Sequence, residues 1–203
     1  MIHPALIAQT SSSPDDDGLR TMNTLYIFAG LPGTGKSELS QNLARERRAV
    51  YLRIDTIEQA LRDARTFHRG GEGYELAYRI ASDNLRLGLD VAADSVNPIQ
   101  ATRVAWREVA LLAGVPFIEI EVVCSNEAEH KKRVEIRSTD IPGLILPTWR
   151  GVMNREYDLW DTEHIVIDTA NKSIEESNAE LRRLLKSVTT DTTREPAREH
   201  NSE

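Results

Sequence analysis

Residues 24–37 read Thr-Leu-Tyr-Ile-Phe-Ala-Gly-Leu-Pro-Gly-Thr-Gly-Lys-Ser. The first six form a short apolar run rich in β-favouring side chains, which is typical of a buried parallel strand. The last eight match the pattern G-x-x-x-x-G-K-[ST] in full, and the apolar spacing of Leu39 and Leu43 predicts a helix over 36–47 directly after it. The stretch therefore predicts a glycine-rich phosphate-binding loop between a parallel strand and a helix.

This loop predicts a nucleotide site on physical grounds. Glycines let successive backbone N–H groups turn towards phosphate oxygens, and the N-terminus of the helix adds partial positive charge. Lys36 is expected to reach the β- and γ-phosphates, and the hydroxyl of Ser37 to bind Mg²⁺. ATP and Mg²⁺ are therefore the expected cofactors. The expected nucleotide-binding residues are Gly30, Leu31, Pro32, Gly33, Thr34, Gly35, Lys36 and Ser37.

Strand and helix patterns alternate along the rest of the chain. Further strands are predicted over 49–54, 89–93, 116–123 and 164–168, and further helices over 56–64, 74–87, 99–113, 126–138, a short stretch ending near 160, and 174–186. Helical crossovers of this length connect parallel strands. The expected fold class is α/β, with one open parallel sheet of five strands, helices on both faces and a small lid.

Composition limits the class of protein further. The chain has 203 residues, a net charge of -7, 40% apolar residues and one cysteine, Cys124. Residues 1–22 and 188–203 are rich in polar and acidic residues and are expected to be disordered tails around a core over 23–187, with Met22 as a possible alternative start. No apolar run reaches the roughly 18 residues of a membrane span, and no secretory signal is evident, so a cytoplasmic protein is expected. The acidic balance argues against anionic membranes and duplex nucleic acid as partners.

Two carboxylates follow predicted strands. Ligands of open α/β sheets bind beyond the carboxyl ends of the strands, where Asp55 and Asp94 are expected. One of the two is expected to hold Mg²⁺, and the other to orient an acceptor hydroxyl or accept its proton. The alternative is that either carboxylate only caps the helix that follows it.

A basic region marks the expected lid. Residues 128–155 contain six basic and three acidic side chains in an otherwise acidic chain. Arg133 and Arg137 lie four residues apart, which predicts that both lie on one face of the helix leading into a lid over 138–155, and both are expected to stabilise a transferring phosphoryl group. The alternative for Arg133 is an ion pair with Glu129 on a solvated helix face.

Two further residues are candidates for substrate contact. Asn97 and Arg103 follow the third predicted strand and lie near the expected site. Arg103 has an alternative place on the exposed face of its helix.

Taken together, these residues resemble the small P-loop kinases. This group includes polynucleotide kinase, adenylylsulfate kinase, gluconate kinase, chloramphenicol phosphotransferase and the zeta toxins, and the likeness is greatest to short bacterial AAA-family ATP-binding proteins related to them. The likeness spans about 24–186. It is carried by Gly30–Ser37, Ile54-Asp55, Asp94–Asn97, the helix around Arg103–Arg107, and Arg133 with Arg137.

The resemblance implies strand order 2-3-1-4-5, with the phosphate-binding loop after the central strand. It also implies transfer of the γ-phosphate of ATP to a hydroxyl, with Asp55 as general base and Asp94 as the carboxylate that holds Mg²⁺ together with Ser37. Lys36 is then a catalytic residue, and Arg133 and Arg137 are lid arginines. The sequence over 138–155 matches no lid of known substrate, so the acceptor stays open between a small molecule and a nucleotide-like molecule, a 5′-OH end included. The alternative function is a nucleotide-gated binding protein with slow hydrolysis. A monomer is the default expectation.

Overall fold

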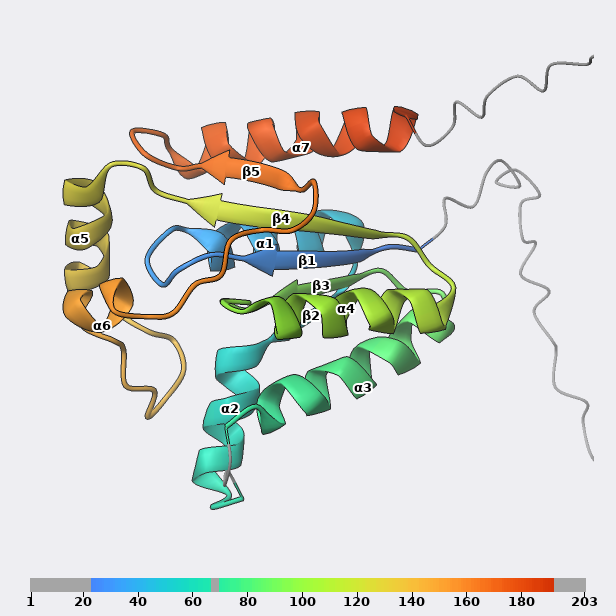
Figure 1. Ribbon diagram of the computed structural model, residues 1–203, viewed down its shortest axis with the longest axis horizontal. Coiled ribbons are helices and arrows are strands. Elements are labelled where there is room, and N and C mark those ends of the chain that lie inside the picture. Colours follow the sequence, from blue (N-terminus) through green and yellow to red (C-terminus); the bar gives the residue numbers. More distant parts are fainter. Residues whose placement is uncertain (1–22, 67–69, 192–203) are drawn as a thin grey trace, which may run out of the picture.

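The computed structural model describes residues 23–66 and 70–191 and contains one parallel sheet (Figure 1). The strands are β1 (Leu25–Ala29), β2 (Val50–Arg53), β3 (Val91–Asp94), β4 (Phe117–Val123) and β5 (Ile165–Asp168). Their order is β2-β3-β1-β4-β5, which confirms the predicted order. Since β1 lies in the centre, the phosphate-binding loop that follows it emerges at the middle of the sheet edge.

Helices cover both faces of the sheet (Figure 1). They are α1 (Lys36–Arg47), α2 (Ile54–Asp63), α3 (Glu72–Arg86), α4 (Gln100–Ala113), α5 (Glu127–Ile136), α6 (Trp149–Met153) and α7 (Ile174–Asp191). Successive side chains of a strand point to opposite faces. Accordingly, Leu25 and Ile27 of β1 pack in the core under α3 and α4, whereas Tyr26 and Phe28 pack in the core under α1 and α7.

Several boundaries differ from the sequence-based expectation, three of them by placing a residue in a different element from the one expected. Helix α2 begins at Ile54, directly after β2, so Asp55 lies in the first turn of this helix and not in a loop between the strand and the helix. Strand β3 includes Asp94, which pairs in register with Phe28 and Arg53. Helix α7 continues to Asp191, so the first residues of the expected C-terminal tail are helical, because extending an existing helix costs little compared with starting one. The rest of that tail and the expected tail 1–22 lie outside the described residues.

The predicted short helix is present as α6, but the prediction that it ends near residue 160 was wrong. Helix α6 ends at Met153, its last hydrogen bonds come from the N–H groups of Asn154 and Arg155, and residues 156–164 are irregular. Long-range contacts hold this segment instead: the N–H of Asp158 donates to the carbonyl of Pro98 at 2.7 Å, and its carboxylate accepts from the N–H of Gln100 at 2.8 Å. These bonds tie the segment to the start of α4.

No helix within 23–66 or 70–191 is both long enough and apolar enough to cross a bilayer.

Candidate active site

The phosphate-binding loop has the backbone geometry that its glycines predict. Gly33 and Gly35 have φ angles of 90° and 91°, in the left-handed region that side chains other than glycine rarely adopt. Gly30 is needed for a close approach, since a Cβ there would lie 2.2 Å from the carbonyl oxygen of Val122 in β4. Helix α1 starts without a side-chain cap, so its first N–H groups remain available to a phosphate.

Lys36 and Asp94 form a buried ion pair behind this loop. The ammonium of Lys36 donates to Asp94, and the hydroxyl of Tyr51 in β2 donates to the other carboxylate oxygen at 2.5 Å. Burial alone would raise the pKa of Asp94, but the charge of Lys36 and hydrogen bonds from Lys36, Tyr51 and Ser37 outweigh it and hold the pKa below its ordinary value. Asp94 is therefore an ionised carboxylate with a serine hydroxyl beside it. Such hard oxygen ligands fit Mg²⁺, which takes few protein ligands and keeps waters and phosphates in its other positions.

Helix α5 packs against the phosphate-binding loop. Nε2 of His130 lies 2.9 Å from the carbonyl oxygen of Pro32, so this nitrogen carries the proton. Thr169, directly after β5, donates its hydroxyl to the carbonyl of Thr34 at 2.8 Å. A Cβ on Gly33 would lie 2.5 Å from Cγ2 of Val134. The loop conformation is thus fixed by α5 and by the end of β5.

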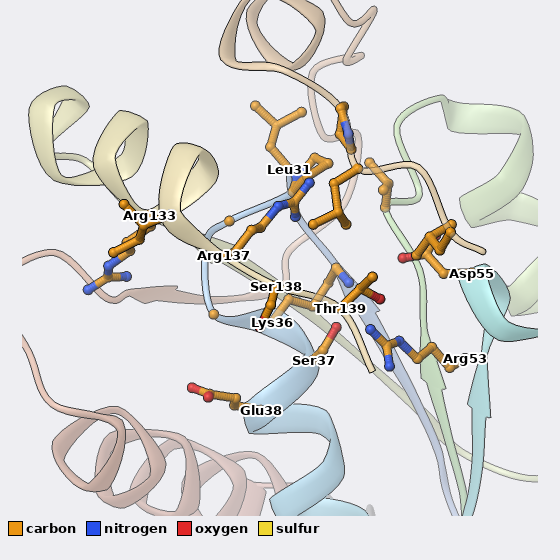
Figure 2. A pocket seen from close by; sticks show the side chains of 18 of the residues that line it. Leu31, Lys36, Ser37, Glu38, Arg53, Asp55, Arg133, Arg137, Ser138 and Thr139 are labelled. Atoms are coloured by element: carbon orange, nitrogen blue, oxygen red, sulfur yellow. The ribbon is translucent and has the colours of Figure 1, made fainter. Parts of the chain in front are cut away.

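The two arginines predicted for the lid have different surroundings. Arg133 donates to the hydroxyl and the carbonyl of Thr169 at 2.8 and 2.9 Å and to Glu129 at 2.6 Å, so the alternative ion pair with Glu129 is present. Helix α5 ends one residue before Arg137, which adopts an extended conformation as its C-cap. The Nε and Nη2 atoms of Arg137 are buried and have no hydrogen-bond partner within residues 23–66 and 70–191. Figure 2 shows the two side chains pointing away from each other, so the expectation that both lie on one helix face was wrong.

Asp55 and Arg53 lie at the far side of Lys36 from Arg133 (Figure 2). Asp55 is exposed in the first turn of α2, and the N-cap of this helix is Arg53, without a side-chain capping bond. The simple capping alternative for Asp55 is therefore absent. Arg53 donates to Asp140 of the 138–148 loop at 2.7 Å, which connects this loop to the end of β2.

Asn97 and Arg103 are buried instead. The amide of Asn97 donates to the carbonyl of Phe28 at 2.9 Å. Arg103 is 0% exposed, donates to the carbonyls of Asn97, Pro98, Asp158 and Leu159, and stacks over the Trp160 ring at 4.1 Å. Neither residue lines the pocket described below, and the exposed alternative for Arg103 was wrong. Both side chains hold backbone segments together, an arrangement that does not favour substrate contact.

A pocket of about 920 Å³ brings most of the remaining candidates together, although the buried Asp94 does not line it. Its lining includes Lys36, Ser37, Asp55, Arg133 and Arg137, and seven cationic side chains face three anionic ones. One end is formed by residues 53–62 after β2, and the other by residues 169–177 after β5. Because β2 and β5 are the opposite edges of the sheet, these two ends lie on opposite sides of the phosphate-binding loop.

Several residues of the site were missed from the sequence. Tyr51 and Arg53 alternate with apolar residues in β2, and this pattern of polar residues on one face was an available signal. Thr169 directly follows β5, where the rule for carboxyl ends also applies. Glu58 lines the pocket from α2, and no local pattern marks it. Arg155 lines the pocket from the segment directly after α6; it belongs to the basic region 128–155, but nothing in that region distinguishes it from the other basic residues.

Solved structures of kinases share this fold. An adenylylsulfate (APS) kinase from Mycobacterium tuberculosis, solved with AMPPNP and APS, superposes with a TM-score of 0.56 at 21% identity, over 81% of this chain and 98% of that one. A gluconokinase from Sinorhizobium meliloti superposes with a TM-score of 0.55 at 16% identity, over 85% of this chain and 99% of that one. Among curated proteins, a "Probable adenylyl-sulfate kinase" from Aeropyrum pernix is 27% identical over 176 residues, 79% of this chain and 91% of that protein.

The fold and the phosphate-binding loop define the class of small P-loop kinases. Within it, the family model AAA_33, described as an AAA domain, matches residues 25–143, from β1 into the 138–148 loop. The chain belongs to this family.

Proposed function

We propose that this protein transfers the γ-phosphoryl group of ATP to a hydroxyl of a small-molecule or nucleotide-like acceptor. The observation that carries the proposal is one pocket in which Lys36 and Ser37 lie between the end after β5 and the end after β2, where the carboxylate of Asp55 lies. In the reaction, an acceptor oxygen forms a bond to the γ-phosphorus and the bond from that phosphorus to the bridging oxygen breaks. ADP leaves, and the proton of the hydroxyl passes to Asp55.

The end after β5 is proposed to bind the nucleoside part of ATP. Ile174, Ser173 and Ser177 line it, which gives an apolar surface and hydroxyl groups for a base and a ribose. Residues 30–37 would surround the phosphates. Lys36 would exchange Asp94 for phosphate oxygens, because in the nucleotide-free protein its charge is already neutralised by that carboxylate.

Ser37 and Asp94 are proposed to hold Mg²⁺. When bound, the ion would neutralise charge on the β- and γ-phosphates. The protein's contribution is to keep Asp94 ionised and oriented, which the Tyr51 hydroxyl supports.

Asp55 is proposed as the general base, with Lys36, Arg133 and Arg137 stabilising the transferring group. Arg137 is the stronger of the two arginine candidates, since two of its buried nitrogens lack partners, whereas Arg133 is already bonded to Glu129 and Thr169. Asn97 and Arg103 are not proposed as substrate contacts, because both are buried and neither lines the pocket. A monomer is the default expectation for the active protein.

The test is ADP release from ATP and Mg²⁺, screened against sugars, hydroxyl-bearing metabolites, nucleosides and 5′-OH oligonucleotides. One acceptor class should raise turnover, and Asp55→Asn should lower the acceptor-dependent rate about 100-fold or more while ATP still binds. Unchanged transfer by Asp55→Asn would remove the general-base assignment. If no acceptor raises turnover but nucleotide changes the binding of a partner, the protein is a nucleotide-gated switch instead.

A further inference from the structure

The acceptor end of the pocket is enclosed by α2 and the 138–148 loop. Arg53 pairs with Asp140 of this loop, and a Cβ on Gly143 would lie 3.1 Å from Nε2 of Gln59 in α2. Leu144, Ile145 and Leu146 line the same pocket, and Ile145 is 91% exposed. The loop thus supplies an apolar wall that an acceptor would cover.

The charges at this end are only partly neutralised. Arg62 pairs with Glu58 at 3.0 Å, and Arg53 pairs with Asp140 at 2.7 Å. Arg137 has two buried nitrogens without a hydrogen-bond partner. The exposed guanidinium of Arg155, at the end of α6, has no hydrogen bond or ion pair to any part of the chain that the structure describes.

Arg155 lies close enough to act electrostatically on both sides of this end. Burial lowers the pKa of Arg137, and the positive charge of Arg155 lowers it further, against the opposing effect of Asp55. Burial raises the pKa of Glu58, and the charges of Arg62 and Arg155 oppose that rise. Arg155 also lines the same pocket as Arg137 and Glu58, and it forms no ion pair with Glu58.

Two neighbouring guanidinium groups without partners repel each other and leave donors unsatisfied. A buried donor without a partner is costly, and a guanidinium forms paired, charge-assisted hydrogen bonds with planar carboxylates and with phosphate or sulfate oxygens. The single unpaired carboxylate here, Asp55, is needed for the acceptor hydroxyl and leaves an excess of positive charge.

We infer that the acceptor is an anionic hydroxyl compound, and that Arg155, beside Arg137, binds its carboxylate, phosphate or sulfate group. This inference rests on the proposed function and adds the charge class of the acceptor. Arg155 is the residue that sets this preference, because Arg137 also borders the phosphate-binding loop and is assigned to the transferring group.

The first test compares acceptors in matched pairs. Each pair holds the hydroxyl constant and changes the charge: glycerol with glycerate and glycerol 3-phosphate, glucose with gluconate, and a nucleoside with its 5′-monophosphate. Only anionic members should raise ADP release. For the best of them, Arg155→Gln should raise KM about tenfold to a hundredfold, the range for losing a charge-assisted hydrogen bond, and Arg155→Lys should recover part of the loss.

Matched controls separate the acceptor from the nucleotide. The Kd of a non-hydrolysable ATP analogue should stay within about twofold in Arg155→Gln, because the nucleoside end lies at the opposite edge of the sheet. Arg150→Gln removes the same charge from α6 at an exposed position outside the pocket lining and should leave KM unchanged. A neutral acceptor that outperforms its anionic partner, or an unchanged KM in Arg155→Gln, would overturn the inference and leave the proposed kinase intact.

A binding measurement distinguishes failure of the proposed anion site from failure of the proposed kinase activity. Inorganic sulfate is titrated into protein already saturated with the ATP analogue, so that the phosphate-binding loop is occupied. Sulfate should bind to the wild type and to Arg150→Gln but lose about tenfold or more in affinity with Arg155→Gln. Sulfate binding that depends on Arg155 without turnover of any acceptor would keep the anion site and reject the kinase. Sulfate binding that ignores Arg155 would reject the anion site.

Discussion

Asp94 is the residue at which the stability of the fold and the proposed chemistry meet. It is 2% exposed and bonds to Lys36 and Tyr51, and both the ammonium and the carboxylate are buried. Removing one partner of a buried ion pair strongly destabilises the folded protein, because the other charge then remains buried without compensation. Asp94 is therefore expected to matter for stability before any ligand binds.

This environment predicts a particular dependence on pH. The pKa of Asp94 in the folded protein lies below its ordinary value. A lowered carboxyl pKa stabilises the fold above the unfolded value of about 3.9, and this contribution is lost as the pH falls towards the folded pKa. Asp94→Asn should lower the free energy of unfolding by about 3 kcal/mol at pH 7 and by less in acid, as measured by urea denaturation between pH 7 and 3.

Asp140→Asn is the control for this measurement. Its partner Arg53 is half-buried, but the Asp140 side chain is 73% exposed, so the loss should stay within about 1 kcal/mol. A difference between wild type and Asp94→Asn that is the same at every pH would contradict the assigned ionisation.

At the scale of elements, the contact between α5 and the phosphate-binding loop predicts different effects of substituting two similar glycines, Gly33 and Gly35. Gly33 and Gly35 have nearly equal φ angles, but a Cβ on Gly33 would lie 2.5 Å from Val134, whereas one on Gly35 would lie 3.7 Å from Thr169. Gly35→Ala should cost about 1 kcal/mol through backbone strain alone, and Gly33→Ala about 3 kcal/mol, because α5 must also move. Thermal or urea unfolding of the two variants measures the difference.

A double-mutant cycle tests the cause. Val134→Ala makes room beside Gly33, so the combination with Gly33→Ala should be less destabilising than the sum of the two single effects by about 1 kcal/mol. The same cycle with Gly35→Ala should be additive. Equal costs for the two glycine variants would show that α5 does not restrict the loop.

The elements also show which parts of the fold the sequence can predict. The strands and the loop after β1 were predictable because their signals are local: apolar runs, glycine spacing and a lysine–serine pair. Residues 156–164 were not, since their conformation depends on Arg103, a residue about fifty positions earlier that donates to the carbonyls of Asp158 and Leu159. Likewise, the direction of Arg137 depends on where α5 ends, and helix ends are the least certain part of a pattern.

At the scale of the whole molecule, the order of the strands places the two ends of the pocket on opposite sides of β1. The candidate residues were predictable as members of one site because the carboxyl ends of all parallel strands meet at one edge. The assignment of each residue to a nucleotide or an acceptor end needed the positions of β2 and β5 on opposite sides of β1. Glu58 and Arg155 entered the site only through this arrangement of distant elements.

This division predicts how nucleotide binding stabilises the variants. A ligand at about 100 times its Kd adds about 2.7 kcal/mol to the stability of the protein, and a chain of this size gains about 2–4 °C in Tm per kcal/mol. A non-hydrolysable ATP analogue with Mg²⁺ should therefore raise Tm by about 5–10 °C in the wild type. Asp55→Asn should keep the whole rise because Asp55 belongs to the β2 end, whereas Lys36→Met should lose it. Differential scanning calorimetry with and without the analogue measures the rise separately for each variant, which removes the effect of breaking the Lys36–Asp94 pair. A rise lost equally in both variants would mean that the two ends of the pocket bind the nucleotide together.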